Sequence, residues 1–305
     1  VKGIFRIAFS AQEKMPAGES VNIVPVGLDY GDYVYPGAHL IVNIGEPIKV
    51  ADFMDIYNEN QAKGLNAVKD ELYHKLKTLT LDLATNDYYD SFYTAVEACQ
   101  ADSLSSLNLE DNTYNRFIAR MHVGKQLVAK EESATTEEME AFDRLCKKYK
   151  EGLQKVKIDT ETLIQPKPGT FKTILKWATI ILNTLLSLPG LVFNIIPAAI
   201  VSFIPKLMKI KFIGFYSSVY YVASIVFFPI FYLIQALVIN SVCGFSWWML
   251  FILIPLQFHL GKLALYLGKN IKALWKKVRL HRIWKWEPEV AEELLVMRRR
   301  IAAYF

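Results

Sequence analysis

The sequence predicts three kinds of structure in succession: an α/β segment, a soluble α-helical region and an α-helical membrane domain. Two apolar, β-branched stretches near the start are typical of buried strands. The middle of the chain repeats apolar residues at helical spacing. The last third contains runs that are almost free of charged residues, and about 20 such residues are enough for a helix to cross a bilayer.

The composition agrees with a protein that has one part in water and one part in a membrane. Hydrophobic residues make up 52% and charged residues 21% of the 305 positions. Residues 1–170 hold 19 Lys and Arg against 26 Asp and Glu, whereas residues 171–305 hold 16 against 4. A basic half that is also apolar indicates contact with anionic lipid rather than with nucleic acid. The three cysteines are widely spaced and form no CxxC pair, which argues against a zinc ribbon or a disulfide framework.

Residues 1–50 form the predicted α/β segment. Pro25 falls near the end of the first strand or at an irregularity in it, because proline cannot donate to a strand ladder. The order of elements suits the closing part of an α/β sheet. The helical pattern begins at once, without a capping residue, so we expect these residues to be a fragment of a longer chain. In chain order, we predict a helix over 2–14, a strand over 21–28, a loop over 31–37 and a strand over 39–44.

Residues 51–160 form the predicted soluble helical region, and residues 161–172 a linker rich in Pro and Gly. Two further helices are expected over 113–131 and 135–157, the second starting with a capping box at Thr135 and Glu138. The pattern suits a lid, an acyl-chain cover, a partner surface or a packed helical extension, and the last is the default interpretation. The first helical stretch, which runs from residue 50 to residue 84, carries its apolar residues at Leu65, Val68, Leu72, Leu76 and Leu79.

The membrane domain is predicted to contain a hairpin and two spans. Pro189-Gly190 interrupts the first apolar run, so we expect half-helices over 174–187 and 191–204 that enter and leave on one face, as a re-entrant or membrane hairpin over 173–205. Spans over 212–240 and 244–267 then leave every loop that contains Lys or Arg on one side. The positive-inside rule makes that side, with the soluble part and the tail, cytoplasmic.

Residues 268–305 form a basic tail in which Lys and Arg alternate with Trp. Trp sits well in the headgroup layer, and each basic residue near the surface attracts anionic lipid by about 1 kcal/mol. An interfacial amphipathic helix is therefore expected, with an ordinary juxtamembrane anchor as the alternative. The same pattern also suits RNA, but it lies beside two predicted spans.

The sequence contains no complete catalytic motif that we can identify. Its five histidines are isolated from one another and from the cysteines at helical spacing, so no metal site is expected. None of them begins an H-x-x-x-x-D motif, and G-x-S-x-G, G-x-G-x-x-G and P-loop motifs are absent. Asp29 and Asp32, with the tyrosine between them, suit either a site or a solvated loop.

Three blocks in the first fifty residues carry a resemblance. They are Lys2-Gly3-Ile4-Phe5-Arg6-Ile7-Ala8, then Ile23-Val24-Pro25-Val26-Gly27-Leu28, then Gly45-Glu46-Pro47-Ile48. In this order and spacing they resemble the closing third of the phospholipid/glycerol acyltransferase domain, a family that includes glycerol-3-phosphate and 1-acylglycerol-3-phosphate acyltransferases. The match covers about one sixth of the chain, and each block alone is weakly specific.

The resemblance implies an enzyme that moves a fatty acyl group from acyl-CoA or acyl carrier protein to a glycerol-phosphate acceptor in phospholipid synthesis, with membrane lipid as a partner and no other cofactor. In the family, a His in H-x-x-x-x-D is the general base for the acceptor hydroxyl, and an F-P-E-G block binds phosphate. Both motifs are missing from this sequence. We therefore expect the chain alone to be inactive.

The resemblance also implies candidate substrate-binding residues. Lys2 and Arg6, one helical turn apart, would share the phosphate of the acceptor; the alternative is a solvated helix face. Val24, Pro25 and Val26 would line the pocket, or would simply be core. Two rival functions remain: a non-catalytic membrane-anchored scaffold, and a lipid-handling protein. The second needs polar groups at membrane depth, for which Asn183, Asn194 and Gln235 are the candidates.

Overall fold

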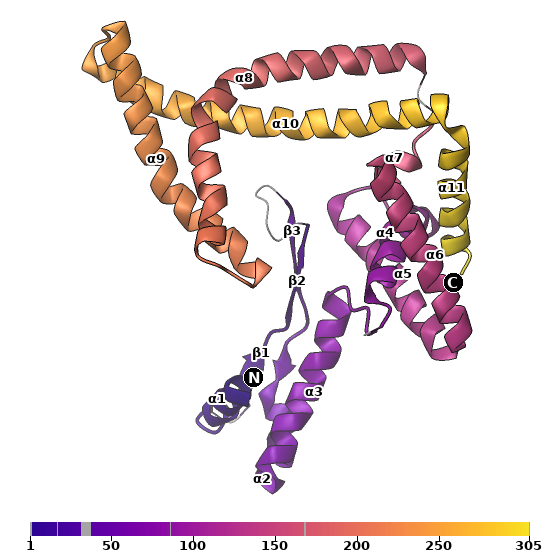
Figure 1. The fold of residues 1–305 in the computed structure, drawn as a ribbon. Coiled ribbons are helices and arrows are strands. Elements are labelled where there is room, and N and C mark those ends of the chain that lie inside the picture. The colour runs from indigo at the N-terminus through magenta and orange to yellow at the C-terminus, as the bar shows by residue number, and fades with distance from the viewer. Residues whose placement is uncertain (1, 17, 32–37, 86, 168, 305) are drawn as a thin grey trace. The chain divides into compact units, whose positions relative to one another are not determined.

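The computed structural model describes residues 2–16, 18–31, 38–85, 87–167 and 169–304. These residues are mostly helical, with a few short strands, and they form two compact units (Figure 1). The first unit contains the described residues up to Lys147 and those from Arg298 onward. The second unit contains the described residues from Lys148 to Met297.

The first unit opens with a helix and a long antiparallel ribbon. β1 pairs with β4, and β2 pairs with β3. The stretch predicted as one strand over 21–28 is divided at Pro25, because a proline has no N–H to give to a neighbouring strand. Across this interruption, the N–H of Gly45 donates to the Pro25 carbonyl at 2.9 Å. The elements are α1 (Lys2–Gln12), β1 (Asn22–Ile23), β2 (Val26–Tyr30), β3 (Leu40–Ile44) and β4 (Ile48–Lys49).

A short 3-10 turn (Val50–Phe53) and two helices, α2 (Met54–Glu59) and α3 (Gln61–Leu79), follow the ribbon. The helical stretch predicted from residue 50 is thus broken at Asn60, whose side chain caps α3 by accepting from the Lys63 N–H at 3.1 Å. The apolar faces of α1 and α3 enclose one core. Its buried members are Phe5, Ala8, Phe9, Ile48, Val50, Tyr57 and Val68.

The rest of the first unit is helical: α4 (Tyr89–Ser106), α5 (Thr113–Ser133), the first half of α6 (Thr136–Val156) and the end of α11 (Pro288–Ala302). α5 and α6 confirm the two helices predicted there. The capping box is also confirmed, since the Thr135 N–H donates to the Glu138 carboxylate at 2.9 Å and the Glu138 N–H donates to the Thr135 hydroxyl at 3.3 Å. The first of these bonds holds the pKa of Glu138 below its usual range.

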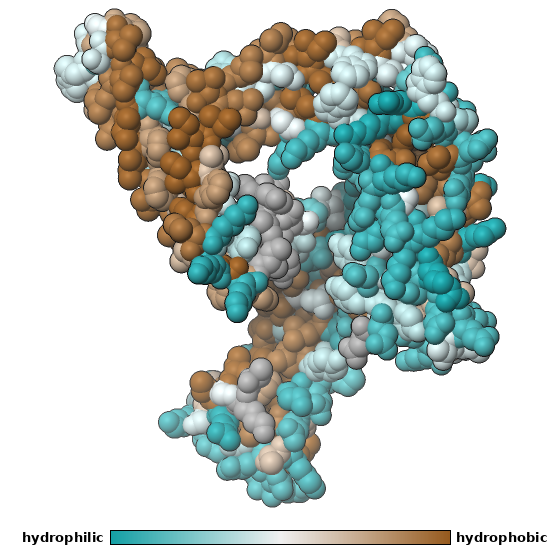
Figure 2. All heavy atoms as spheres, in the orientation of Figure 1, coloured by the Kyte–Doolittle hydropathy of each residue, from teal (hydrophilic) through white to brown (hydrophobic). Residues whose placement is uncertain are grey.

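The second unit contains α7 (Thr160–Leu163) and three helices that are long and apolar enough to cross a membrane. Figure 2 shows hydrophobic side chains over much of their visible surface. The three are α8 (Thr170–Leu207), α9 (Tyr216–Cys243) and α10 (Leu250–Trp286), the last with a 3-10 turn (Trp247–Met249) before it. This protein is therefore membrane-embedded, in agreement with the predicted membrane domain.

α8 corrects the prediction of two half-helices over 174–187 and 191–204. The structure has one helix through Pro189 and Gly190, bent in its middle (Figure 1). Proline removes one helical hydrogen bond and its ring crowds the preceding turn, and a long helix accommodates this by bending. The bend is supported by tight packing: a Cβ on Gly190 would touch the backbone carbonyl of Leu260 in α10.

α10 corrects the boundary predicted between a span ending at 267 and a separate tail. The helix continues without a break to Trp286, and α11 follows it. Two residues beyond the apolar run contact other parts of the second unit. The ring of Trp275 meets that of Trp177 in α8 edge-to-face at 4.8 Å between centroids, and Lys276 forms an ion pair with Asp159. Packing of this kind extends the helix beyond the apolar run.

Candidate functional site

Arg6 lies at the edge of a cleft of about 560 Å³ between α1 and α3. Its side chain is exposed, and Glu13 of the same helix lines the cleft with it. The side chain of Lys2 lies outside the described residues. A shared phosphate contact by Lys2 and Arg6 therefore stays a prediction. The cleft is completed by Ser10, Tyr57, Gln61, Ala62, Leu65 and Asn66.

Val24, Pro25 and Val26 lie on the ribbon and do not line the cleft that holds Arg6. Pro25 is buried, and its ring lies 3.0 Å from the position that a Cβ on Gly45 would take. Val24 and Val26 are 47% and 43% exposed. Arg6 therefore does not share this cleft with Val24, Pro25 and Val26, which are themselves divided between core and surface.

One face of the β2–β3 pair is apolar and uncovered, and we call it the open face. It consists of three directly opposed cross-strand pairs, each made of two large hydrophobic residues. Every one of the six side chains is at least 40% exposed. An apolar patch of this regularity marks a surface that packs against something else. The pairs are Val26 with Ile44, Leu28 with Val42, and Tyr30 with Leu40.

The opposite face of the same pair is packed within the first unit. A Cβ on Gly27 would touch the backbone carbonyl of Leu79, so this strand lies directly on the end of α3. The side chain of Asn43 donates to the same carbonyl at 2.9 Å. Ile41 is buried against Phe117 and Met121 of α5. The ribbon is packed on α3 and α5 through one face, and the apolar side chains of the other face are partly exposed.

A mostly buried ion pair joins the end of β2 to α5. Arg120 Nη2 lies 2.6 Å from the Asp29 carboxylate, and the two side chains are 11% and 15% exposed. The Arg120 Nε atom is buried without a partner. Asp29 was one of two aspartates that the sequence placed in either a site or a solvated loop. The structure makes Asp29 an anchor, and Asp32 lies outside the described residues.

The two buried cysteines are not poised to react. Burial raises the pKa of the Cys99 thiol to about 12 and raises that of Cys146 as well, so neither forms the reactive thiolate. In the part of the chain that the structure describes, no group of three or more His, Cys, Asp and Glu is placed to hold a metal ion.

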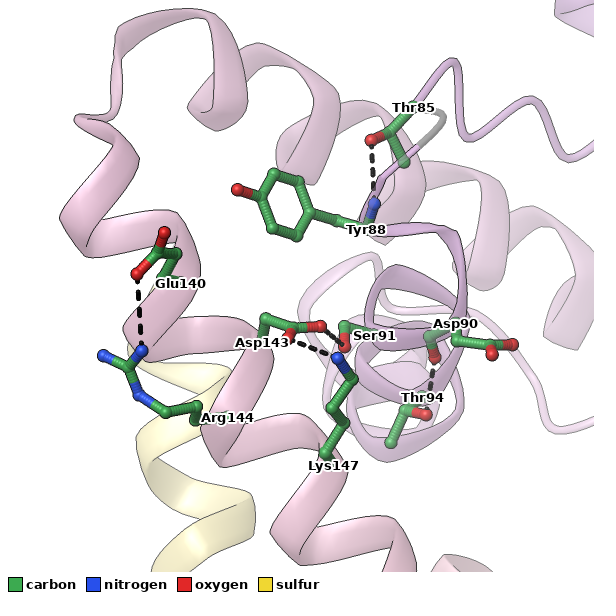
Figure 3. Close-up of polar contacts among 9 residues, drawn as sticks. All are labelled: Thr85, Tyr88, Asp90, Ser91, Thr94, Glu140, Asp143, Arg144 and Lys147. Carbon is green, nitrogen blue, oxygen red and sulfur yellow. Dashed lines mark hydrogen bonds and ion pairs between the residues drawn. The ribbon is translucent and has the colours of Figure 1, made fainter.

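Ser91, Asp143 and Lys147 come together between α4 and α6 (Figure 3). The Ser91 hydroxyl donates to one oxygen of Asp143 at 2.6 Å, and Lys147 donates to the other at 2.6 Å. Partial burial raises the pKa of Asp143, but these two bonds outweigh it and the net pKa is low. The bond to Asp143 raises the pKa of Lys147, whereas a base for Ser91 would need a lowered one. This cluster joins two helices and does not activate the serine.

Polar side chains from all three long helices meet in the second unit. Tyr232 donates its hydroxyl to Asn194 Oδ1 at 2.5 Å, and Asn194 Nδ2 donates to the Gly190 carbonyl at 2.8 Å, next to the bend of α8. Gln257, only 1% exposed, donates to the Tyr232 carbonyl at 3.2 Å. Gln235 donates to the Phe193 carbonyl at 3.1 Å.

Asn194 and Gln235 were recognised from the sequence as polar groups at membrane depth. Tyr232 and Gln257 were missed, although an amide inside an uncharged apolar run was the available signal. The side-chain oxygens of Gln235 and Gln257 are buried without partners. Hydrogen bonds between helices are a main source of their association in lipid, so this cluster joins α8, α9 and α10.

Comparisons with known protein families, with curated proteins and with solved structures found no match to this chain.

Proposed function

We propose that this chain is the membrane-bound C-terminal part of a glycerolipid acyltransferase. The enzyme moves a fatty acyl group from acyl-CoA or acyl carrier protein to a hydroxyl of a glycerol-phosphate acceptor. The observation that carries the proposal is the open face of the β2–β3 pair. Val26 and Leu28 of this face belong to the second of the three sequence blocks that resemble the closing third of an acyltransferase α/β domain, and its other four residues lie between the second block and the third.

The open face supports the proposal because it is built as an interior surface. Covering six half-exposed apolar side chains contributes about 5–9 kcal/mol, because fully burying one such side chain contributes roughly 1.5–3 kcal/mol. A two-stranded ribbon by itself has no layer of helices that would cover an apolar face. In an α/β sheet, helices cover each face. In the proposed enzyme, the remaining strands and helices of the domain cover this face, and they come from polypeptide outside residues 1–305.

The proposed reaction follows from the family that the blocks resemble. A His, oriented by an Asp, takes the proton from the acceptor hydroxyl as its oxygen attacks the thioester carbonyl. The tetrahedral intermediate then collapses, an ester bond forms, and the thiol leaves with the proton. No residue of this chain supplies that base, so the role of the chain is to complete the sheet, contact the acceptor and hold the enzyme in the membrane.

The arrangement of the second unit supports a re-entrant α8. If α9 and α10 cross the bilayer in opposite directions, the end of α10 returns to the side where α9 began. The start of α8 lies beside the end of α10, because Trp177 packs on Trp275. Both ends of α8 then lie on one side, and its bend enters the bilayer. Because Lys206 lies in the last turn of α8 and Lys209 and Lys211 follow the helix, the positive-inside rule makes this side cytoplasmic.

The proposal is tested by an acyl-transfer assay on membranes. The full native product of the gene and residues 1–305 alone are each given radiolabelled acyl-CoA or acyl carrier protein, with glycerol-3-phosphate or its 1-acyl form as acceptor. We expect transfer by the native product and none by residues 1–305. Loss of the Arg6 charge (Arg6→Ala) should raise the acceptor KM, while Lys14→Ala, in the turn just after the same helix, should not. A native product inactive with every pair would leave a membrane-anchored scaffold or a lipid-handling protein.

A further inference from the structure

The second unit contains a cavity of about 680 Å³ that lies outside the proposed acyltransferase site. It is enclosed by the second half of α6, the end of α10 and the start of α11, all within that unit. Five of the fourteen residues that line it are Lys or Arg and three are Glu. The basic residues are Lys148, Lys155, Lys157, Arg279 and Arg282.

Four of these five cations have no carboxylate partner among the described residues. Lys148 is paired with Glu293 at 2.7 Å, and that pair lowers the pKa of Glu293. Glu151 and Glu287 are the other two acids of the lining, and neither forms an ion pair with a lining cation in the part of the chain that is described. The cavity therefore presents an excess of positive charge to whatever enters it.

The backbone at the end of α6 holds one of these cations in an unfavourable conformation. Lys157 has a φ of 55°, in the left-handed region that favours glycine. Glycine is the common residue at this position after a helix. The carbonyl of Lys157 also accepts a bond from Arg279 Nη1 at 3.1 Å, which fixes this guanidinium at the rim of the cavity.

The cavity also has an apolar floor. Ile283, Leu294 and Met297 line it and are buried in the unit. Gly152 admits Leu294 to this floor, because a Cβ there would lie 2.6 Å from a Leu294 methyl group. Cations around an apolar floor suit a molecule with both a phosphate and a non-polar body, rather than a bare inorganic ion.

The distance between the cavity and the apolar run of α10 bears on whether the ligand is a soluble molecule or a lipid headgroup. Arg279 lies about 18 Å of helix beyond Leu267, where the apolar run ends. A tilt of about 40° still leaves roughly 14 Å along the membrane normal. The headgroup layer is only about 5–8 Å thick on each side. If the hydrocarbon core ends at Leu267, this distance favours a soluble phosphate over that of a bilayer lipid.

We propose that this cavity is a binding site for a soluble organic phosphate, with Lys155, Lys157, Arg279 and Arg282 as its phosphate contacts. Planar guanidinium groups bind phosphate oxygens in pairs, and the lysines add point charges. This assignment does not depend on the acyltransferase proposal, because none of these residues belongs to the blocks that resemble that family.

The test measures binding of adenosine diphosphate and of inorganic pyrophosphate to the full 305-residue chain in detergent, by titration calorimetry. We expect both to bind, adenosine diphosphate more tightly because its base covers the apolar floor. The double variant Arg279→Gln, Arg282→Gln should bind at least about tenfold more weakly. The matched double variant Lys272→Gln, Lys285→Gln removes two charges from the same helix outside the cavity and should bind within about twofold of the wild type.

Two further measurements keep the proposal open to refutation. Lys157→Gly relieves the backbone strain, so weaker binding by this variant at an unchanged or higher melting temperature cannot be attributed to misfolding. Binding of adenosine diphosphate is also measured for the 305-residue chain in phosphatidylcholine nanodiscs, with and without phosphatidic acid. This comparison distinguishes a soluble phosphate from a lipid phosphate as the ligand. Equal binding in both supports a soluble ligand. Loss of diphosphate binding in the discs with phosphatidic acid, or equal binding by the two double variants in detergent, would overturn the proposal.

Discussion

Replacing Asp29 by Val tests whether the buried ion pair anchors the β2–β3 ribbon to α5. The change leaves the Arg120 guanidinium, 11% exposed, without the carboxylate that lies 2.6 Å away, its one carboxylate partner among the described residues. Breaking a fully buried pair costs about 3–5 kcal/mol, and the remaining exposure reduces this to about 2–3 kcal/mol. Valine favours strand structure, so a weaker strand preference would not explain a loss. The ribbon should therefore open about 30 to 150 times more often.

Amide hydrogen exchange, read by mass spectrometry on peptides that cover residues 26–44, measures this opening directly. Asp111→Ala is the matched control, because it breaks the pair with Arg116 on the same helix, where both side chains are far more exposed. An exposed pair contributes at most about 1 kcal/mol. Adding Arg120→Met to Asp29→Val should restore most of the protection. Exchange that rises no more in Asp29→Val than in Asp111→Ala would refute the anchor.

Three more variants test other parts of the structure. Lys157→Gly should raise the melting temperature of the chain in detergent, because glycine removes about 1 kcal/mol of left-handed strain; an unchanged or lower value would contradict this. Gly190→Ala should lower the melting temperature by circular dichroism, at a cost of about 1–3 kcal/mol where α8 meets α10, whereas Gly268→Ala, which meets nothing within 4 Å, should not. Burial raises the pKa of Asp159, but bonds from Lys276 and Thr162 bring it below its usual range. The ionised carboxylate therefore stabilises the fold at neutral pH, and this stabilisation is lost as the pH falls through the folded-state pKa. Asp159→Asn should make the melting temperature less sensitive to acid below about pH 4.

Local patterns were enough to predict most of the elements. Apolar residues at spacings of three and four placed the helices of the soluble region, and the capping box at Thr135 located the start of α6. Uncharged runs placed the long helices of the membrane domain. The two strand stretches were recognised from β-branched residues, including the interruption at Pro25. These features depend on residues close together in the sequence, which is why the sequence alone was informative.

The features that were missed depend on contacts between distant residues. Pro189-Gly190 suggested a break between two helices, but packing against Leu260, seventy positions further on, holds α8 as one bent helix. Alternation along β2 indicates one buried face and does not say whether the structure covers it. The cavity beside Arg279 needs the end of α6 and the end of α10 in one place, and no local pattern predicts that. Asp29 found its partner at Arg120, in another helix.

The central claim is that the open face is an interior surface of a larger α/β domain, and cysteine accessibility tests it most directly. Val42→Cys, on the open face, is made with the exposed Cys243 replaced by Ser, in residues 1–305 and in the full native product of the gene. Lys69→Cys, on the exposed side of α3, is the control. The account predicts that a maleimide modifies position 42 at least about tenfold more slowly in the native product than in residues 1–305, with position 69 unchanged. Equal rates at position 42 would show that nothing covers the face and would contradict the account.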